Sequence, residues 1–134
     1  MTLTESVDRI LSEGTTLTDR FYELFFERHP EARALFDKTH MSAQSVMLSA
    51  ALMVTKHYPD YPLATRQYLN VLGTRHARKD VPRELYPAFQ EIFLVALEEF
   101  HGEDWNDDLS RQWREALESV VQLMFDGYDH RAHV

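Results

Sequence analysis

Two polar side chains that stand on otherwise apolar helical stripes are the first candidates for chemistry. Leu69, Leu72 and His76 recur at helical spacing, and Gln44 stands on a stripe that continues through Leu48. An imidazole on an apolar face is either a core histidine bonded to a backbone carbonyl or an axial ligand for haem iron. An amide buried without hydrogen bonds costs about 1–3 kcal/mol, so Gln44 requires a partner, either on a neighbouring helix or in a bound group.

Tyr22 is a third candidate. It lies in the aromatic run from Phe21 to Phe26, where an ordinary core tyrosine is the simpler interpretation. The chain has six other histidines, and most of them stand among polar or charged neighbours. These six are His29, His40, His57, His101, His130 and His133. Only His76 lines up with a helical apolar stripe, so it is the histidine for which the choice between a core residue and an iron ligand has to be made.

Other kinds of site lack part of their pattern. Glu98 and His101 supply the Glu-x-x-His spacing of a di-iron bundle once, but no second copy exists. No Gly-x-Ser-x-Gly motif is present to expose a serine nucleophile, and the four glycines form no phosphate-binding loop. Cysteine is absent, which excludes disulfides and thiolate ligands, so a metal would have to be bound by histidine or carboxylate.

The composition indicates one folded domain that avoids polyanions. With 134 residues, 44% of them hydrophobic and 12% aromatic, the chain is long enough to bury a core. A net charge of −8 disfavours binding to nucleic acid or to an anionic membrane. The first residues lack a continuous apolar stretch, and no later run approaches the roughly 20 apolar residues of a membrane span. We therefore expect a cytoplasmic protein.

Apolar spacings of three and four residues along almost the whole chain predict an all-α fold, since β-branched runs of strand length are missing. We expect a first helix that opens at Thr4 or Ser6 and ends at Gly14. Further helices are expected from 16 to before 30, in a short turn ending at 36, from 41 to about 58, from 62 through 76, from 85 to about 100, and from about 107 to 128.

Several segments together resemble bacterial single-domain haemoglobins and the globin domains of flavohaemoglobins. They are Phe-Tyr-Glu-Leu-Phe-Phe at 21–26, His-Pro-Glu-Ala-Arg-Ala-Leu-Phe-Asp at 29–37, Gln44, Leu-Gly-Thr-Arg-His at 72–76, Val81, Tyr-Pro at 86–87 and Trp113. The interval of 32 residues from Gln44 to His76 also matches that family. The resemblance implies a single globin domain over 1–134, with six to eight helices that sandwich a haem and a shortened first helix.

The resemblance also implies roles for individual residues around haem b, the iron protoporphyrin IX. His76 would be the proximal iron ligand, and Tyr22 and Gln44 would form the hydrogen-bonding pair on the gas-binding side. The other residues implied to contact the haem are Phe36, Leu48, Leu72, Val81 and Tyr86. Thr18 and Ser45 would lie where two helices cross closely beneath the distal face.

Two positions depart from the family pattern. Tyr128 stands where flavohaemoglobins have a glutamate that polarises the proximal histidine, and a phenol cannot supply that negative charge. Val46 and Met47 stand where a basic residue often reaches a haem propionate. We expect Arg75, Arg78 or Lys79 to take that role.

The resemblance implies a protein that binds O₂, and also NO or CO, at an iron that is pentacoordinate or water-bound. Each hydrogen bond to bound O₂ contributes roughly 0.5–1.5 kcal/mol, so the Tyr22–Gln44 pair predicts high O₂ affinity. One alternative is an NO dioxygenase that depends on an external reductase, because the flavin and nicotinamide domains of flavohaemoglobins are missing from these residues. The other alternative is a gas sensor that acts through a partner. No residue is assigned as catalytic.

Overall fold

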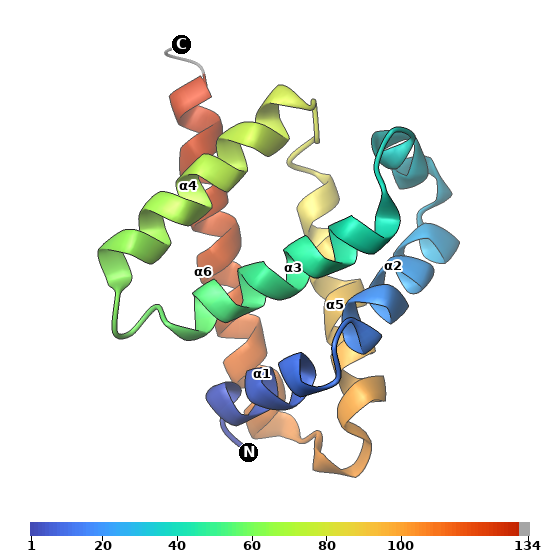
Figure 1. The fold of residues 1–134 in the computed structure, drawn as a ribbon, viewed down its shortest axis with the longest axis vertical. Coiled ribbons are helices and arrows are strands. Elements are labelled where there is room, and N and C mark those ends of the chain that lie inside the picture. Colours follow the sequence, from blue (N-terminus) through green and yellow to red (C-terminus); the bar gives the residue numbers. More distant parts are fainter. Residues whose placement is uncertain (132–134) are drawn as a thin grey trace.

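The computed structural model describes residues 1–131, and this part of the chain is helical throughout, with no strand (Figure 1). The elements are α1 (Leu3–Ser12), α2 (Thr16–Arg28), η1 (Pro30–Phe36), α3 (Met41–Lys56), α4 (Pro62–Arg78), α5 (Leu85–His101), η2 (Gly102–Asp104) and α6 (Asp107–Arg131). The predicted all-α fold is confirmed. The side chain of His130 and residues 132–134, which include His133, lie outside the described part.

The start of α1 differs from the prediction. Thr2, rather than Thr4 or Ser6, caps the helix: its side chain accepts a hydrogen bond from the Glu5 backbone, and the Glu5 side chain accepts one from the Thr2 backbone. Ser6 is buried instead, and its hydroxyl bonds to groups from other helices. The helix also ends at Ser12, two residues before Gly14, which occupies the turn with φ +66°.

The later helix boundaries agree with the sequence signals. Pro62 lies in the first turn of α4, where its missing N–H costs nothing. Gly102 ends α5 with φ +56°, a conformation that suits a residue without Cβ. The Asn106 side chain accepts the backbone N–H of Leu109 at 2.8 Å at the start of α6. These ends set the lengths of the helices that frame the candidate site.

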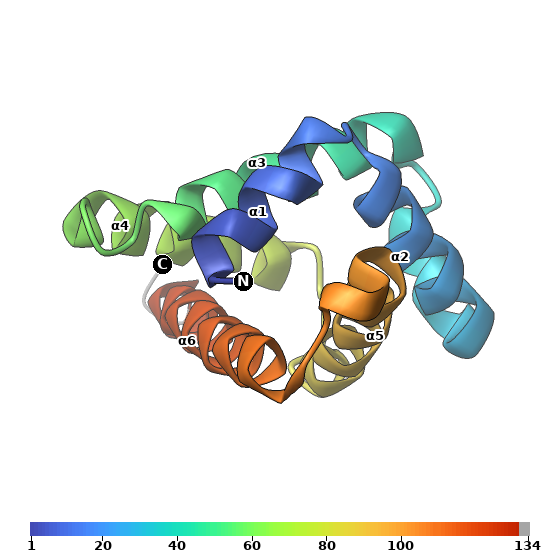
Figure 2. The ribbon, with the colours of Figure 1, turned by 90° about the horizontal axis from the view of Figure 1, so that it is seen from below.

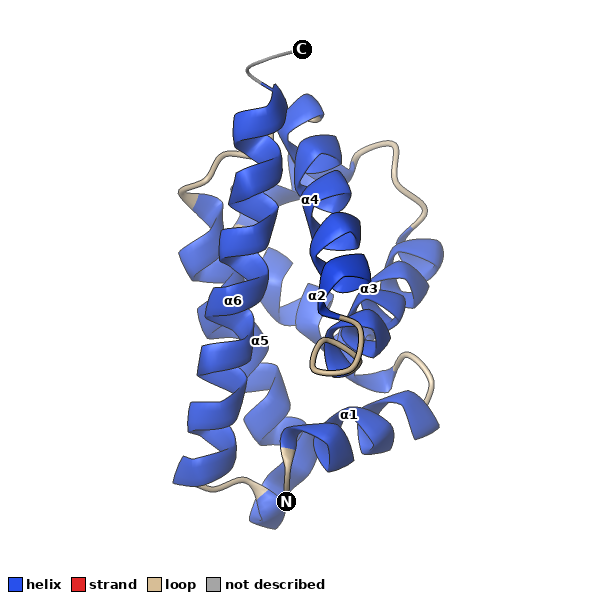
Figure 3. Cartoon of the chain, turned by 90° about the vertical axis from the view of Figure 1, so that its left-hand side faces the viewer, coloured by secondary structure: helices blue, strands red, loops and turns tan. Residues whose placement is uncertain are grey.

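The helices are arranged in two layers. Figure 2 shows α1, α3 and α4 along one side of the molecule and α5 and α6 along the other. α4 packs on α6, as Figure 3 shows from the side, and α2 packs on α5. α3 and α4 meet at the loop between them and separate toward their other ends (Figure 1). Gln44 lies in the first turn of α3 and His76 in the last turn of α4, so both belong to the separated ends.

The buried core of the described residues is divided into two hydrophobic clusters. The larger one joins α1, α2, α3, α5 and the first half of α6, with Phe21, Phe93 and Trp113 as its largest fully buried side chains. The smaller one joins α4, the start of α5 and the second half of α6 around Leu69, Tyr86, Val121 and Met124. The helices that carry Gln44 and His76 therefore contribute to different clusters, α3 to the larger one and α4 to the smaller one.

Candidate functional site

His76 is held in one orientation and one tautomer by its own helix. Its Nδ1 lies 2.8 Å from the backbone oxygen of Leu72, one turn earlier, and can only donate to that acceptor. Burial lowers the pKa of His76, so the ring is neutral at physiological pH. The lone pair is therefore on Nε2, which forms no hydrogen bond within residues 1–131. A neutral imidazole with an unbonded Nε2 has the lone pair that coordination of a metal requires.

Two glycines bring the helix of His76 unusually close to α6. A Cβ on Gly73 would lie 1.9 Å from the backbone oxygen of Met124, and one on Gly127 would lie 2.0 Å from that of Asn70. The Thr74 hydroxyl donates across this crossing to the backbone oxygen of Gly127 at 2.8 Å. Because the backbones are in direct contact, the position of His76 follows that of α6.

The chain turns immediately after His76 in a tight C-terminal motif. The Val81 N–H donates to the His76 carbonyl at 3.1 Å, and the Asp80 N–H donates to the Ala77 carbonyl at 3.0 Å. This is the Schellman arrangement, with Asp80 at φ +61° in the position that glycine usually occupies. The His76 carbonyl is the acceptor of the longer of these two turns, and the His76 ring bonds to Leu72 one turn earlier. Both the backbone and the side chain of the candidate ligand are therefore held by hydrogen bonds.

Two tyrosines fix the segment that follows the turn. The Tyr128 hydroxyl donates to the Val81 carbonyl at 2.7 Å, so the Tyr86 hydroxyl is the donor in the 3.0 Å contact between the two phenols. Burial raises the pKa of Tyr86 above its ordinary value. Tyr128 thus hydrogen-bonds to the backbone that follows α4 and not to His76. The imidazole of His76 bonds to the Leu72 carbonyl, and within residues 1–131 no carboxylate polarises this imidazole.

Tyr22 and Gln44 form a hydrogen-bonded pair between α2 and α3. The Gln44 amide Nε2 donates to the Tyr22 hydroxyl oxygen at 3.0 Å. Tyr22 is only 8% exposed, and burial raises the pKa of its phenol to about 12 although the bond from Gln44 opposes that shift. Because the phenol accepts from Gln44, its own proton remains available to another acceptor. The pair therefore presents Tyr22 as a neutral donor whose oxygen Gln44 holds in place.

The two predicted apolar neighbours lie on the same side as this pair. The ring of Phe36, at the end of η1, meets that of Tyr22 edge to face, with centroids 5.7 Å apart. Leu48, one turn after Gln44, packs against the larger cluster. Thr18 and Ser45 are both buried, and Thr18 bonds to the Ser49 hydroxyl at 3.4 Å, which allows a close approach of α2 and α3.

The eight predicted residues fall into two groups, one on each cluster. The first group packs on or bonds to the larger cluster and consists of Tyr22, Phe36, Gln44 and Leu48. The second belongs to α4 and the smaller cluster and consists of Leu72, His76, Val81 and Tyr86. No hydrogen bond or ring contact joins the two groups in the described chain.

The donor set at His76 fits a metal that brings its own ligands. No three histidine, aspartate or glutamate side chains come together within residues 1–131. One imidazole alone does not hold an iron ion, but it is sufficient for iron already bound by four porphyrin nitrogens. A flat apolar macrocycle also fits a core that is divided into two clusters. The residues present therefore fit haem.

The sequence analysis missed how deeply His101 is buried. His101 is only 5% exposed, its Nε2 lies 2.6 Å from the Ser6 hydroxyl, and that hydroxyl accepts the indole N–H of Trp113 at 3.0 Å. The spacing of Phe93, Leu97 and His101, four residues apart, was the available signal. His101 bonds within the larger cluster region and belongs to none of the groups around His76.

Comparisons with known proteins decide the family. The family model described as Globin matches residues 19–124. This chain belongs to the globin family. The match spans from the second turn of α2 into the second half of α6, so it includes Tyr22, Gln44 and His76.

The curated relatives of this globin are mainly longer proteins. Flavohemoproteins of Halalkalibacterium halodurans and Chromobacterium violaceum are each 29% identical to it, over 117 and 114 residues that cover 85% and 83% of this chain. The chain spans only 28% of the length of each of these two relatives. An uncharacterized globin-like protein of Aquifex aeolicus is 26% identical over 119 residues and is covered to 84% of its length.

Two solved structures have the same fold. One is a proposed nitric oxide dioxygenase of Rhodothermus marinus, engineered as a carbene transferase; it is 27% identical, with a TM-score of 0.83 over 98% of this chain and 89% of that one. The other is a bacterial globin of Campylobacter jejuni, 18% identical, with a TM-score of 0.85 over 98% of this chain and 95% of that one. The globin fold is therefore confirmed.

None of the helices in residues 1–131 combines the length and the apolar composition that a bilayer crossing requires.

Proposed function

We propose that this globin binds haem b through Nε2 of His76 and binds O₂, NO or CO on the opposite side, next to Tyr22 and Gln44. The observation that supports this most directly is the 3.0 Å hydrogen bond from Gln44 to Tyr22, because it leaves the phenol proton of a buried, neutral tyrosine free to be donated. A buried donor of this kind needs a partner that residues 1–131 do not supply for it, and a gas ligand is such a partner.

Haem iron, when present, supplies the sixth coordination position at which a diatomic gas binds. Tyr22 would donate a hydrogen bond from its hydroxyl group to the bound gas, while Gln44 keeps the phenol oriented by donating a hydrogen bond to its oxygen. Phe36 and Leu48 exclude water from the pair. One donated hydrogen bond stabilises the complex by roughly 0.5–1.5 kcal/mol, and about 1.4 kcal/mol corresponds to a tenfold change in a rate. The pair therefore supports high O₂ affinity.

A second candidate function is NO dioxygenation with electrons from an external reductase. The likeness to flavohemoproteins and to a proposed nitric oxide dioxygenase of Rhodothermus marinus favours it. The His76 imidazole donates only to the backbone carbonyl of Leu72, and no carboxylate within residues 1–131 raises its basicity, which supports gas binding more strongly than oxygen activation. We therefore rank gas binding first.

The O₂ dissociation rate tests the role of the pair. Tyr22→Phe removes the donor without changing the packing, so we expect O₂ release from the haem-loaded protein to become about tenfold faster. Tyr61→Phe is the matched control, since the Tyr61 side chain is exposed, and should release O₂ at the wild-type rate. Equal rates in wild type and Tyr22→Phe would refute the assignment of Tyr22.

Sustained NO consumption separates the two functions. The haem-loaded protein is mixed with NO, O₂, NADH and a flavin reductase, and nitrate is measured over many turnovers. Nitrate equal to the protein concentration, and no more, supports gas binding as the function. Continued nitrate formation that stops when the reductase is omitted would replace it with NO dioxygenation.

A further inference from the structure

Helix α4 has the opposite charge from the rest of the chain. The 18 residues from Pro62 to Lys79 include four basic side chains and no acidic one, whereas the remaining residues have ten basic and 22 acidic side chains, a net charge of −12. The four cations are Arg66, Arg75, Arg78 and Lys79. All four are exposed, and none forms an ion pair within residues 1–131.

Stability of the helix explains only part of this pattern. Cations in the last turn of a helix are favourable because they interact with its carbonyl end, and this accounts for Arg75, Arg78 and Lys79. The same effect favours acidic residues in the first turn of α4, where there is none. Elsewhere in the described chain, cations such as Arg9, Arg20 and Lys56 are paired with carboxylates. The absence of acidic residues from α4 therefore requires another reason.

Part of the cationic surface points away from the haem side of α4. Successive residues of an α-helix are about 100° apart, so Arg78 lies about 160° and Val71 about 140° around α4 from His76. Arg78 is thus directed away from the side on which His76 binds iron. Arg75 and Lys79 lie about 100° and 60° from His76, close enough to the haem side to pair with its propionates.

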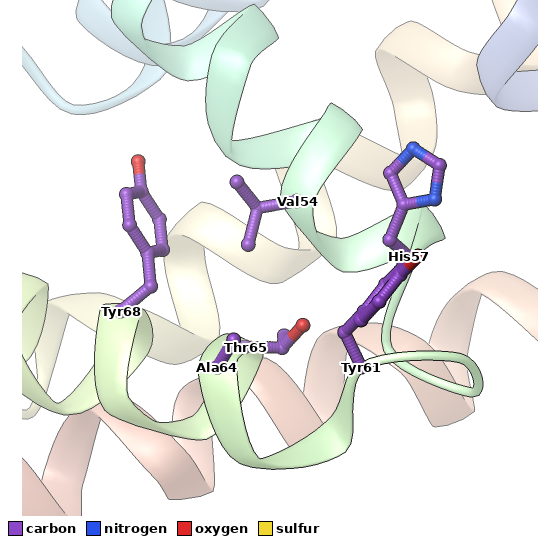
Figure 4. Close-up of a pocket in the computed structure, with 6 residues that line it drawn as sticks. All are labelled: Val54, His57, Tyr61, Ala64, Thr65 and Tyr68. Carbon is purple, nitrogen blue, oxygen red and sulfur yellow. The ribbon is translucent and has the colours of Figure 1, made fainter.

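Exposed apolar side chains accompany the cations on this helix. Within residues 1–131, every large hydrophobic side chain of the exposed class lies between positions 46 and 71; on α4 these are Leu63, Tyr68 and Val71. Tyr68 also lines a hollow of about 360 Å³ with Val54, His57, Tyr61, Ala64 and Thr65, at the end where α3 and α4 meet (Figure 4). An apolar patch next to a charged rim is the usual composition of a protein interface.

We infer that one exposed side of α4 is the docking surface for an acidic one-electron carrier protein, with Val71 and Arg78 on its outward edge and Tyr68, Arg75 and Lys79 on the edge nearer His76. This inference rests on the proposed function, since it requires haem at His76. Within the 134 residues there is no motif for binding a flavin or nicotinamide nucleotide, so these residues themselves supply no second redox group for the iron.

Charge complementarity selects the partner and its orientation. An acidic protein is repelled by the remaining surface, with its net charge of −12, and is attracted only by α4. Docking there brings the carrier next to the helix that holds the iron ligand. A reduced carrier docked there would give one electron to ferric iron: the carrier would be oxidised by one electron and the iron would become ferrous, with no bond made or broken.

Binding to a plant-type [2Fe–2S] ferredoxin of strongly negative net charge tests the inference. The dissociation constant for the oxidised ferredoxin is measured by titration calorimetry with the haem-loaded chain, at about 10 mM and about 150 mM salt. For Arg78→Glu we expect the dissociation constant to rise about fivefold at low salt, with a smaller change at the higher salt.

Arg28→Glu is the matched control. Arg28, like Arg78, is the exposed last residue of a helix and forms no ion pair within residues 1–131, so both variants change the net charge and the helix end equally. The control should bind ferredoxin with less than a twofold change, about the precision of the method. Equal weakening in both variants would overturn the inference, because it would report only net charge.

The remaining outcomes are also decisive. A chain that takes up no haem, shown first by its absorption spectrum, refutes the proposed function rather than the docking surface. A haem-loaded chain that does not bind ferredoxin at low salt overturns the docking surface alone. Binding to vesicles of phosphatidylglycerol without binding to ferredoxin would likewise overturn it, and would assign the basic helix to a membrane surface.

Discussion

Replacing Gly73 with alanine tests how α4, and with it His76, is positioned. The added Cβ would lie 1.9 Å from the oxygen, 2.6 Å from the carbonyl carbon and 2.7 Å from the Cα of Met124, all of them backbone atoms of α6. A backbone cannot rotate away as a side chain does. The two helices must therefore separate by about 1 Å before the contact becomes tolerable.

Helix propensity and packing predict opposite signs for this substitution. Alanine is favoured over glycine in a helix interior by about 1 kcal/mol, which alone would stabilise the variant. Forcing a methyl group into a close-packed contact costs about 1–3 kcal/mol and occasionally more, and here Leu69 would also lose packing in its cluster with Val121 and Met124 of α6. We expect the packing cost to prevail, with a net loss of about 1–2 kcal/mol.

Urea unfolding of the apoprotein measures the net effect, and the rate of haem loss to an acceptor protein measures its consequence at His76. Ala64→Gly is the control, because Ala64 is an exposed residue of the same helix and reports propensity alone, at a cost of about 1 kcal/mol. We expect Gly73→Ala to unfold at lower urea and to lose haem faster than wild type. A variant more stable than wild type would refute the close crossing and the positioning of His76 derived from it.

Three further predictions concern strain and titration. Because Asp80 has φ +61°, Asp80→Gly should be more stable than Asp80→Ala by about 1 kcal/mol in urea unfolding, and equal stabilities would contradict the left-handed backbone. Burial lowers the pKa of His101, so the stability that its neutral ring contributes is present above the unfolded value of about 6.5 and is lost as pH falls. His101→Gln should therefore lose less Tm on acidification than wild type, and an equal loss would contradict the burial of His101. Burial raises the pKa of Tyr22 to about 12, so the stability that the neutral phenol contributes is present below the unfolded value of about 10 and is lost as pH rises toward 12. Tyr22→Phe should therefore lose less Tm than wild type between about pH 9 and about pH 12, and an equal loss would contradict the burial of the phenol.

Local periodicity was sufficient to single out His76 and Gln44 and to place most helix ends, whereas the other candidate residues came from the family resemblance. His76 and Gln44 were visible because each interrupts an apolar stripe of its own helix, and Pro62, Gly102 and Asn106 mark boundaries through their backbone chemistry. These signals depend on neighbours within about one helical turn. The pattern of a single helix was therefore enough to read them.

Features that depend on two distant segments could not be predicted in this way. Ser6 is of a residue type that often caps helices, but its hydroxyl is hydrogen-bonded to His101 and Trp113, about one hundred residues away along the chain. Thr2 caps α1 instead. The contact between Gly73 and α6 requires the crossing of two helices, which glycine content alone does not indicate. The hydrogen bond from Gln44 to Tyr22 likewise depends on how α2 and α3 pack.

Titration of hemin into the apoprotein tests the central claim most directly. We expect the wild type to bind one hemin per chain, and to give a new absorption spectrum after reduction with dithionite and addition of CO. His57→Ala, the control at an exposed histidine, should behave like the wild type, and His76→Ala should retain no stable haem. A wild-type protein that stays colourless, or a His76→Ala variant with the wild-type spectrum, would contradict the assignment of His76 as the iron ligand.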